Sequence, residues 1–100
     1  MKTTGRIFGA LADPTRRQIL QELKEGELQA GEIVGRFALS GPAISRHLSI
    51  LETAGLLTSR REANRIYYRL ETEPLADALG DFLSAVCPTQ IVHRRKKRRN

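Results

Sequence analysis

Apolar residues in the first quarter of the chain recur at the spacing of helices. Asp13 and Pro14 predict a helix start, because Asp caps exposed N–H groups and Pro fits the first turn. The apolar residues that follow lie on one side of this helix: Ile19, Leu20 and Leu23. Gly26 supplies a left-handed stop. A shorter preceding helix is indicated by a further apolar set: Ile7, Phe8 and Leu11.

Two more helices follow, joined by a tight connection at residues 38–40. The first runs from Ala30 to Phe37, with Ile33, Val34 and Phe37 on a common face. Ser40 caps the second helix, and Pro42 sits in its first turn. The second helix then carries a buried stripe at helical spacing: Ile44, Leu48 and Leu51. Gly55 ends it.

After Leu56 the apolar period changes from helical to two. Between Arg65 and Leu70, apolar and polar side chains alternate, which predicts a half-buried strand. The stretch from Leu57 to Arg61 can pair with it across Glu62-Ala63-Asn64, where Asn tolerates a positive φ. We therefore expect a β hairpin.

A last helix is expected from about Pro74 to Val86, with Pro88 as its stop. One apolar stripe runs along it: Leu75, Leu79, Phe82, Leu83 and Val86. The order of elements predicts a mostly α protein with a small β hairpin, a winged helix-turn-helix with a helix at each end. We expect one domain over residues 1–88 and a basic, disordered tail over 89–100.

The charge of the chain is informative only where it is local. The net charge is +6, but the tail holds six of the 17 basic residues, and without it 11 basic residues face 11 acidic ones. The folded body is thus close to neutral. The arginines of the hairpin, Arg60, Arg61, Arg65 and Arg69, stand against Glu62 and form a local positive projection.

The helix that begins after Ser40 is a candidate for the DNA major groove. Its buried stripe leaves polar or small residues on the other side: Ser40, Gly41, Pro42, Ser45, Arg46 and Ser49. Arg46 is long enough to donate two hydrogen bonds to guanine. We expect Arg60, Arg61 and Arg65 of the hairpin to contact the DNA backbone or minor groove. The alternatives are an ordinary amphipathic helix and a strand edge kept soluble by charge.

Three segments resemble the ArsR/SmtB family of bacterial repressors. They are Leu11 to Leu20 (LADPTRRQIL), Ser40 to Leu48 (SGPAISRHL) and Leu51 to Leu57 (LETAGLL). Arg61 to Leu70, with its paired tyrosines, is similar to the wing of that family. The resemblance implies operator binding by a homodimer whose interface is formed by the first and last helices. The expected interface residues are Ile7, Phe8, Leu11, Leu75, Leu79, Phe82, Leu83 and Val86.

The sequence departs from the metal-sensing members of this family. The segment from Gly31 to Phe37 lacks their cysteine pair, and Asp77 and Asp81 have no histidine beside them in the last helix. Zinc and thiophilic metals need several nitrogen or sulfur ligands. We therefore expect no metal site and no cofactor. The resemblance is closest to the metal-independent members that repress their own operons.

The remaining reactive side chains favour structural roles. His47 lies between the buried and exposed faces of its helix, so we expect it to pack or to orient the helix by a hydrogen bond. For Cys87 we favour packing over a redox switch or an intersubunit disulfide. No nucleophile and base stand at a fixed spacing, so an enzyme is not expected. A lone cysteine and the absence of an apolar signal or membrane-spanning run favour the cytoplasm.

These observations predict a repressor that occludes a promoter, including its own, by binding double-stranded operator DNA as a homodimer. Release would then come from a protein or small-molecule effector. The alternative is a winged-helix module that binds a partner protein without specific DNA contact, which would need neither Arg46 nor the arginines of the hairpin.

Overall fold

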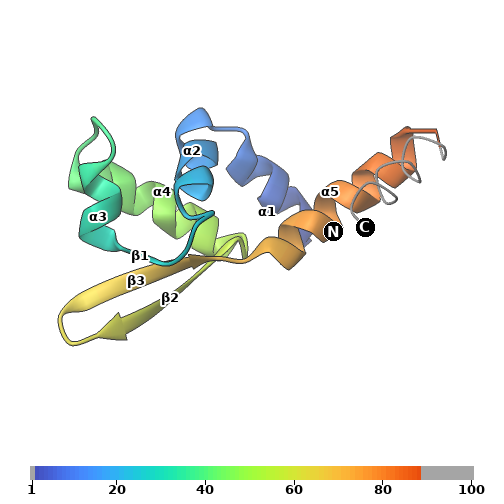
Figure 1. The fold of residues 1–100 in the computed structure, drawn as a ribbon. Coiled ribbons are helices and arrows are strands. Elements are labelled where there is room, and N and C mark those ends of the chain that lie inside the picture. Colours follow the sequence, from blue (N-terminus) through green and yellow to red (C-terminus); the bar gives the residue numbers. More distant parts are fainter. Residues whose placement is uncertain (1, 89–100) are drawn as a thin grey trace.

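The computed structural model describes residues 2–88, with side chains from residue 4 onward, so the expected basic tail lies outside the described residues. The elements are α1 (Lys2–Leu11), α2 (Pro14–Glu22), β1 (Leu28–Gln29), α3 (Ala30–Gly35), α4 (Gly41–Thr53), β2 (Leu57–Glu62), β3 (Arg65–Leu70) and α5 (Thr72–Val86) (Figure 1). This is the mostly helical winged helix-turn-helix that the sequence predicts. None of the described helices is long and apolar enough to cross a membrane.

Side-chain caps fix the starts of α2 and α4, as predicted. An Asp13 carboxylate oxygen accepts hydrogen bonds from the backbone N–H groups of Thr15 and Arg16, at 2.8 and 3.2 Å. The Ser40 hydroxyl accepts from the backbone N–H of Ala43 at 3.2 Å. These bonds satisfy N–H groups that have no partner inside the helix. The predicted helix from Ala30 to Phe37 is shorter in the structure, because α3 ends at Gly35.

The sheet has three antiparallel strands in the order β1-β3-β2, so the predicted hairpin gains a strand. In the hairpin, Leu57 pairs with Leu70 at the base and Glu62 pairs with Arg65 at the turn. The strand β1 was not predicted, since its two residues are too few to show a period. The positive φ expected at Asn64 belongs instead to Ala63, at 57°.

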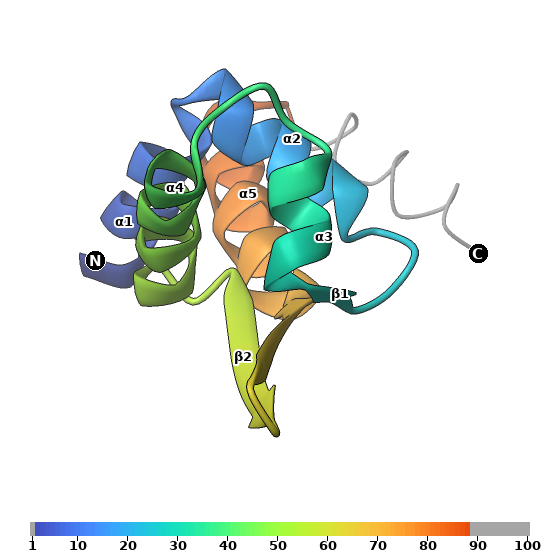
Figure 2. The ribbon, with the colours of Figure 1, turned by 90° about the vertical axis from the view of Figure 1, so that its left-hand side faces the viewer.

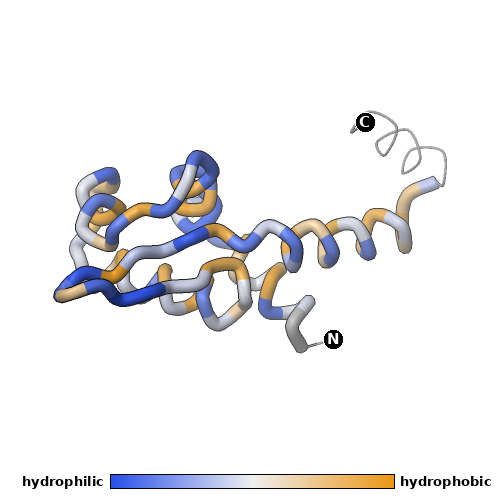
Figure 3. The backbone as a smooth tube through the Cα atoms, turned by 60° about the horizontal axis from the view of Figure 1, so that its bottom comes forward, coloured by the Kyte–Doolittle hydropathy of each residue, from blue (hydrophilic) through white to orange (hydrophobic). Residues whose placement is uncertain are grey.

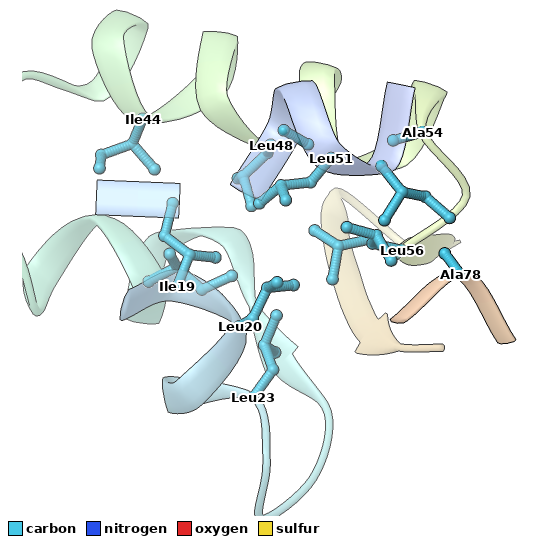
Figure 4. Packing of buried hydrophobic residues seen from close by; sticks show 13 residues of the cluster. Ile19, Leu20, Leu23, Ile44, Leu48, Leu51, Ala54, Leu56 and Ala78 are labelled. Carbon is cyan, nitrogen blue, oxygen red and sulfur yellow. The ribbon is translucent and has the colours of Figure 1, made fainter. Parts of the chain in front are cut away.

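The core lies between the helices and the base of the hairpin. It collects buried side chains from α1 to α4 and from the start of β2: Ile7, Ala10, Ile19, Leu20, Leu23, Ile33, Ile44, Leu48, Leu51, Ala54, Leu56 and Leu57 (Figure 4). Within the described part of the chain, Ala78 is the one α5 residue in this cluster. Helix α5 therefore extends away from the core, and the hairpin projects on another side (Figure 1).

Candidate nucleic-acid interface

The outer face of α4 is open to solvent, while its inner face is fully buried. Ile44, Leu48 and Leu51 are at most 2% exposed and hold the helix against the core. The residues proposed from the sequence to meet DNA lie on the other side: Ser40, Pro42, Ser45, Arg46 and Ser49 are exposed, and Gly41 is half-buried. In Figure 2, α4 and the hairpin stand free on neighbouring parts of the surface. Both elements are thus accessible to a large partner.

Arg16 ties α4 to the first two helices. From the first turn of α2, its Nε donates to the carbonyl of Ala10 at 2.7 Å and one Nη donates to the carbonyl of Gly9 at 3.2 Å. The other Nη lies 3.2 Å from Nδ1 of His47 on α4. Because a guanidinium only donates, this contact is a hydrogen bond when Nδ1 carries no proton. Of the two roles expected for His47, packing or a hydrogen bond, this contact favours the hydrogen bond, and the partner, Arg16, was not foreseen.

The arginines of the hairpin fall into two groups. Arg60 is paired with Glu27 and Glu62, and Arg69 is paired with Glu71. Arg61 and Arg65 are exposed next to the turn, and within residues 4–88 no carboxylate forms an ion pair with either of them. The available positive charge is therefore concentrated at the tip of the hairpin.

Hydrogen bonds keep the carboxylates near the base of the hairpin ionised. Those from Arg60 lower the pKa of Glu27, while those from Thr58 and then Arg69 lower the pKa of Glu71. Ionised carboxylates cancel the charge of Arg60 and Arg69. Figure 3 shows hydrophilic colouring along β2 toward the turn, whereas the colouring of β3 is mixed. The tip thus keeps a positive charge that the base has lost.

A second exposed surface lies on α5, remote from α4 and the hairpin (Figure 1). Leu79, Phe82 and Val86 are 38%, 52% and 60% exposed. The ring of Phe82 meets that of Phe8 edge-on, with centroids 5.6 Å apart. We call Leu79, Phe82 and Val86 the α5 stripe. Because they lie on one helix, they form a candidate surface for binding another molecule.

The residues expected at the dimer interface differ in how far their side chains are exposed to solvent. Phe8, Leu11, Leu75 and Leu83 are half-buried, which leaves them accessible in part. Ile7 is 2% exposed, because its position on α1 turns it into the core of the protomer. Ile7 therefore supports the helix from behind and presents almost no area to a partner.

The residues considered as metal ligands do not gather in the structure. Asp77 and Asp81 are exposed on α5, and Cys87 is half-buried after the end of that helix. In the part of the chain that the structure describes, no three His, Cys, Asp or Glu side chains are placed to hold one ion.

Comparisons with known proteins agree with this arrangement. Residues 13–59 match the family model described as bacterial regulatory protein, arsR family. The transcriptional repressor SdpR of Bacillus subtilis is 42% identical over 80 residues, which are 80% of this chain and 89% of that protein. An HTH-type transcriptional regulator of Mycobacterium tuberculosis is 40% identical over 81% of this chain and 76% of its own length.

A solved structure extends the similarity to the whole fold. The crystal structure of an ArsR family transcriptional regulator superposes with a TM-score of 0.78 at 30% sequence identity. The match covers 84% of this chain and 86% of that one. The similarity therefore includes the helices outside residues 13–59 as well as the matched segment.

Proposed function

Because this chain belongs to the arsR family of bacterial regulatory proteins and is a DNA-binding transcriptional repressor, we propose that it occludes a promoter as a homodimer. The observation that carries this proposal is the free outer face of α4, where Arg46 is exposed opposite a fully buried stripe. Two such helices related by a twofold axis would enter successive major grooves, about 34 to 36 Å apart, and exclude polymerase. We place the protein in the cytoplasm, where its operator would be.

We assign different tasks to the residues of α4. Arg46 reads a base, since its guanidinium can make two parallel bonds to guanine. Ser45 and Ser49 reach base edges or phosphates from the same exposed face. Ser40, Gly41 and Pro42 form the first turn, where backbone can approach a phosphate. Together they set the register of the helix in the groove.

We assign Arg61 and Arg65 to the DNA backbone or minor groove, because they hold the unpaired charge at the tip of the hairpin. Replacing both with Ala should lower the slope of log affinity against log salt by about two units, one for each phosphate that is no longer neutralised. The measurement is a gel shift on the DNA upstream of the protein's own gene, repeated at rising salt. Lys24→Ala, which removes an exposed charge outside the hairpin, is the control.

The salt series also tests the proposed function itself. A steep loss of binding with salt by the unaltered protein supports DNA occupation. Absence of binding even at low salt would instead favour a module that binds a partner protein. An unchanged slope in the Arg61 and Arg65 variant, with binding intact, would remove the hairpin tip from the interface.

We propose that the α5 stripe, with Phe8, Leu11, Leu75 and Leu83 around it, forms the homodimer interface. Three of the five exposed large hydrophobic side chains of the described residues lie on α5, while the other two, Leu39 and Ile50, lie singly in the α3–α4 connection and on α4. A symmetric dimer places the same patch of both copies together and so removes both stripes from water. This proposal also accounts for the projection of α5 away from the core.

We further propose that the protein represses its own operon independently of metals. The three ligand candidates, Asp77, Asp81 and Cys87, would give a weak oxygen site and one sulfur per protomer. Zinc, cadmium and arsenite titrated into the protein–operator complex under reducing conditions should leave the fluorescence anisotropy unchanged. A stoichiometric metal that weakens binding tenfold, about 1.4 kcal/mol of coupling, would overturn the proposal.

Release of the operator would then depend on a protein or small-molecule effector. An open pocket of about 380 Å³ between α1 and α4 is lined by Arg6, Gly9, Ala10, Ser49 and Ile50 among others. It is a suitable place for a small ligand, since it touches both the helix proposed for the dimer and the helix proposed for DNA. We assign no cofactor to the protein.

A further inference from the structure

Arg60 has its whole guanidinium group engaged within the protein. Its Nε and one Nη donate to the two carboxylate oxygens of Glu27, at 3.0 and 2.8 Å. The other Nη donates to Glu62 at 2.6 Å. The group also stacks over the ring of Tyr67, 4.5 Å from its centroid. Parallel bonds of this kind fix direction as well as distance.

These contacts cross the entire sheet. Arg60 lies on β2, Tyr67 on the neighbouring β3, and Glu27 in the connection just before β1. Because the strand order is β1-β3-β2, the side chain of Arg60 passes over the central strand to reach Glu27. Glu27 and Arg60 are 33 positions apart in sequence. The pair therefore adds a side-chain link beside the β1–β3 ladder, which joins the hairpin to the same segment at Leu28 and Gln29.

The local charge argues against a direct role for Arg60 on DNA. Two carboxylates surround one guanidinium, which leaves a net negative charge at this place. A phosphate approaching Arg60 would meet Glu27 and Glu62 as well, and would be repelled by both. Arg61 and Arg65 carry no such partners among the described residues.

We propose that Arg60 and Glu27 form a brace that holds the hairpin in the direction needed for Arg61 and Arg65 to meet DNA. Arg60 is then a positioning residue rather than a phosphate contact. Glu27, although acidic, promotes binding to a polyanion because it holds the hairpin in place. The proposal rests on the proposed role of the hairpin tip in DNA binding. We name this unit of Arg60, Glu27 and Tyr67 the wing brace.

Breaking the wing brace should change operator affinity only modestly, but the direction of the change distinguishes the brace from simple electrostatics. Partly exposed ion pairs are weak, and the two side chains here are 50% and 31% exposed. A bidentate contact that also stacks on a ring is at the stronger end of this class. Loosening the hairpin raises the entropy cost of binding, so affinity falls although every protein–DNA contact is still made.

Glu27→Gln tests the brace against simple electrostatics. Removing a negative charge should tighten DNA binding if only the net charge matters. The brace predicts the opposite: operator affinity should fall by roughly threefold to fivefold, the scale of one such ion pair. Glu25→Gln makes the same charge change on the same connection and should not weaken binding. Tighter binding by Glu27→Gln with a steeper salt slope would show that Arg60 had been freed to contact phosphate.

Arg60→Lys gives a second comparison, because Lys keeps the charge but cannot make the parallel bonds or the stack. We expect it to weaken operator binding as much as Glu27→Gln does. The double variant should be no weaker than either single one, since both changes break the same contact. Full affinity in Arg60→Lys would mean that the charge alone matters, and would overturn the brace.

A measurement on the free protein separates this inference from the function on which it rests. The NMR order parameter of the Arg60 Nε–H should be near 0.85 in the unaltered protein and should drop below about 0.6 in Glu27→Gln. Unchanged thermal unfolding would show that the fold is intact. A mobile Arg60 in the unaltered protein would overturn the brace. An unchanged salt slope in the Arg61 and Arg65 variant, with binding intact, would instead overturn the hairpin's role in DNA binding.

Discussion

Replacing Arg46 with Ala is expected to weaken operator binding by about 1 to 3 kcal/mol while changing the affinity for random DNA much less. Arg46 is exposed in the first turns of α4, opposite the buried Ile44, Leu48 and Leu51. A bidentate contact to guanine forms only where the correct base is present, so the effect of removing it should depend on sequence. Fluorescence anisotropy on the two DNAs in the same buffer measures it.

Arg46→Lys serves as the matched control, since it keeps the charge and removes the planar fork. If Arg46 reads a base through its planar fork, the Lys variant should bind the operator more weakly than the unaltered protein does, and random DNA equally well. An equal loss of affinity on both DNAs in Arg46→Ala would reduce Arg46 to a phosphate contact. In that case the base would have to be read by Ser45 or Ser49.

Replacing Phe82 with Asp is expected to give a monomer that no longer holds the operator. Phe82 is 52% exposed at the centre of the α5 stripe. Burying an aromatic anchor contributes about 2 kcal/mol or more to an interface. Because a twofold axis uses this side chain twice, the dimer should lose about 4 kcal/mol of association free energy. Its dissociation constant should therefore rise roughly a thousandfold. Sedimentation equilibrium measures the change.

Leu39→Asp is the control for this variant. Leu39 is similarly exposed, at 41%, but it lies in the connection between α3 and α4, at the other end of the protein from α5. It should leave the oligomeric state unchanged. A Phe82→Asp protein that stays dimeric, with normal far-ultraviolet circular dichroism, would move the interface away from the α5 stripe.

Local signals are enough to predict most of the fold. The cap of α4 at Ser40 and the buried stripe that follows lie within a few residues of one another. The alternation from Arg65 to Leu70 likewise predicts the second strand of the hairpin, although Glu62, expected in the turn, belongs to β2. The exposure of Arg46 follows from the same periodicity, because fixing the buried side of a helix fixes its opposite side. The main candidate site could therefore be placed from the amino-acid pattern alone.

The features that the sequence did not reveal depend on contacts between distant residues. Glu27 is an unremarkable acidic residue until the sheet brings it beside Arg60, 33 positions away. Arg16 belongs to a segment that resembles the family, yet its bonds to α1 and to His47 exist only in the folded protein. The burial of Ile7 within the protomer could not be predicted for a related reason: helical spacing identifies an apolar face but does not say which neighbour will cover it.

The exposed α5 stripe has a consequence for how the amount of protein controls a promoter. If the protein pairs through the α5 stripe as proposed, and most copies are separate, the concentration of paired copies rises with the square of the total by mass action. Halving the total then lowers occupation of a two-part operator about fourfold at low filling. Dilution during cell growth would thus lift repression more sharply than a one-copy regulator allows. Under the proposed interface, the apolar area on Leu79, Phe82 and Val86 would set the protein level at which this steep response begins.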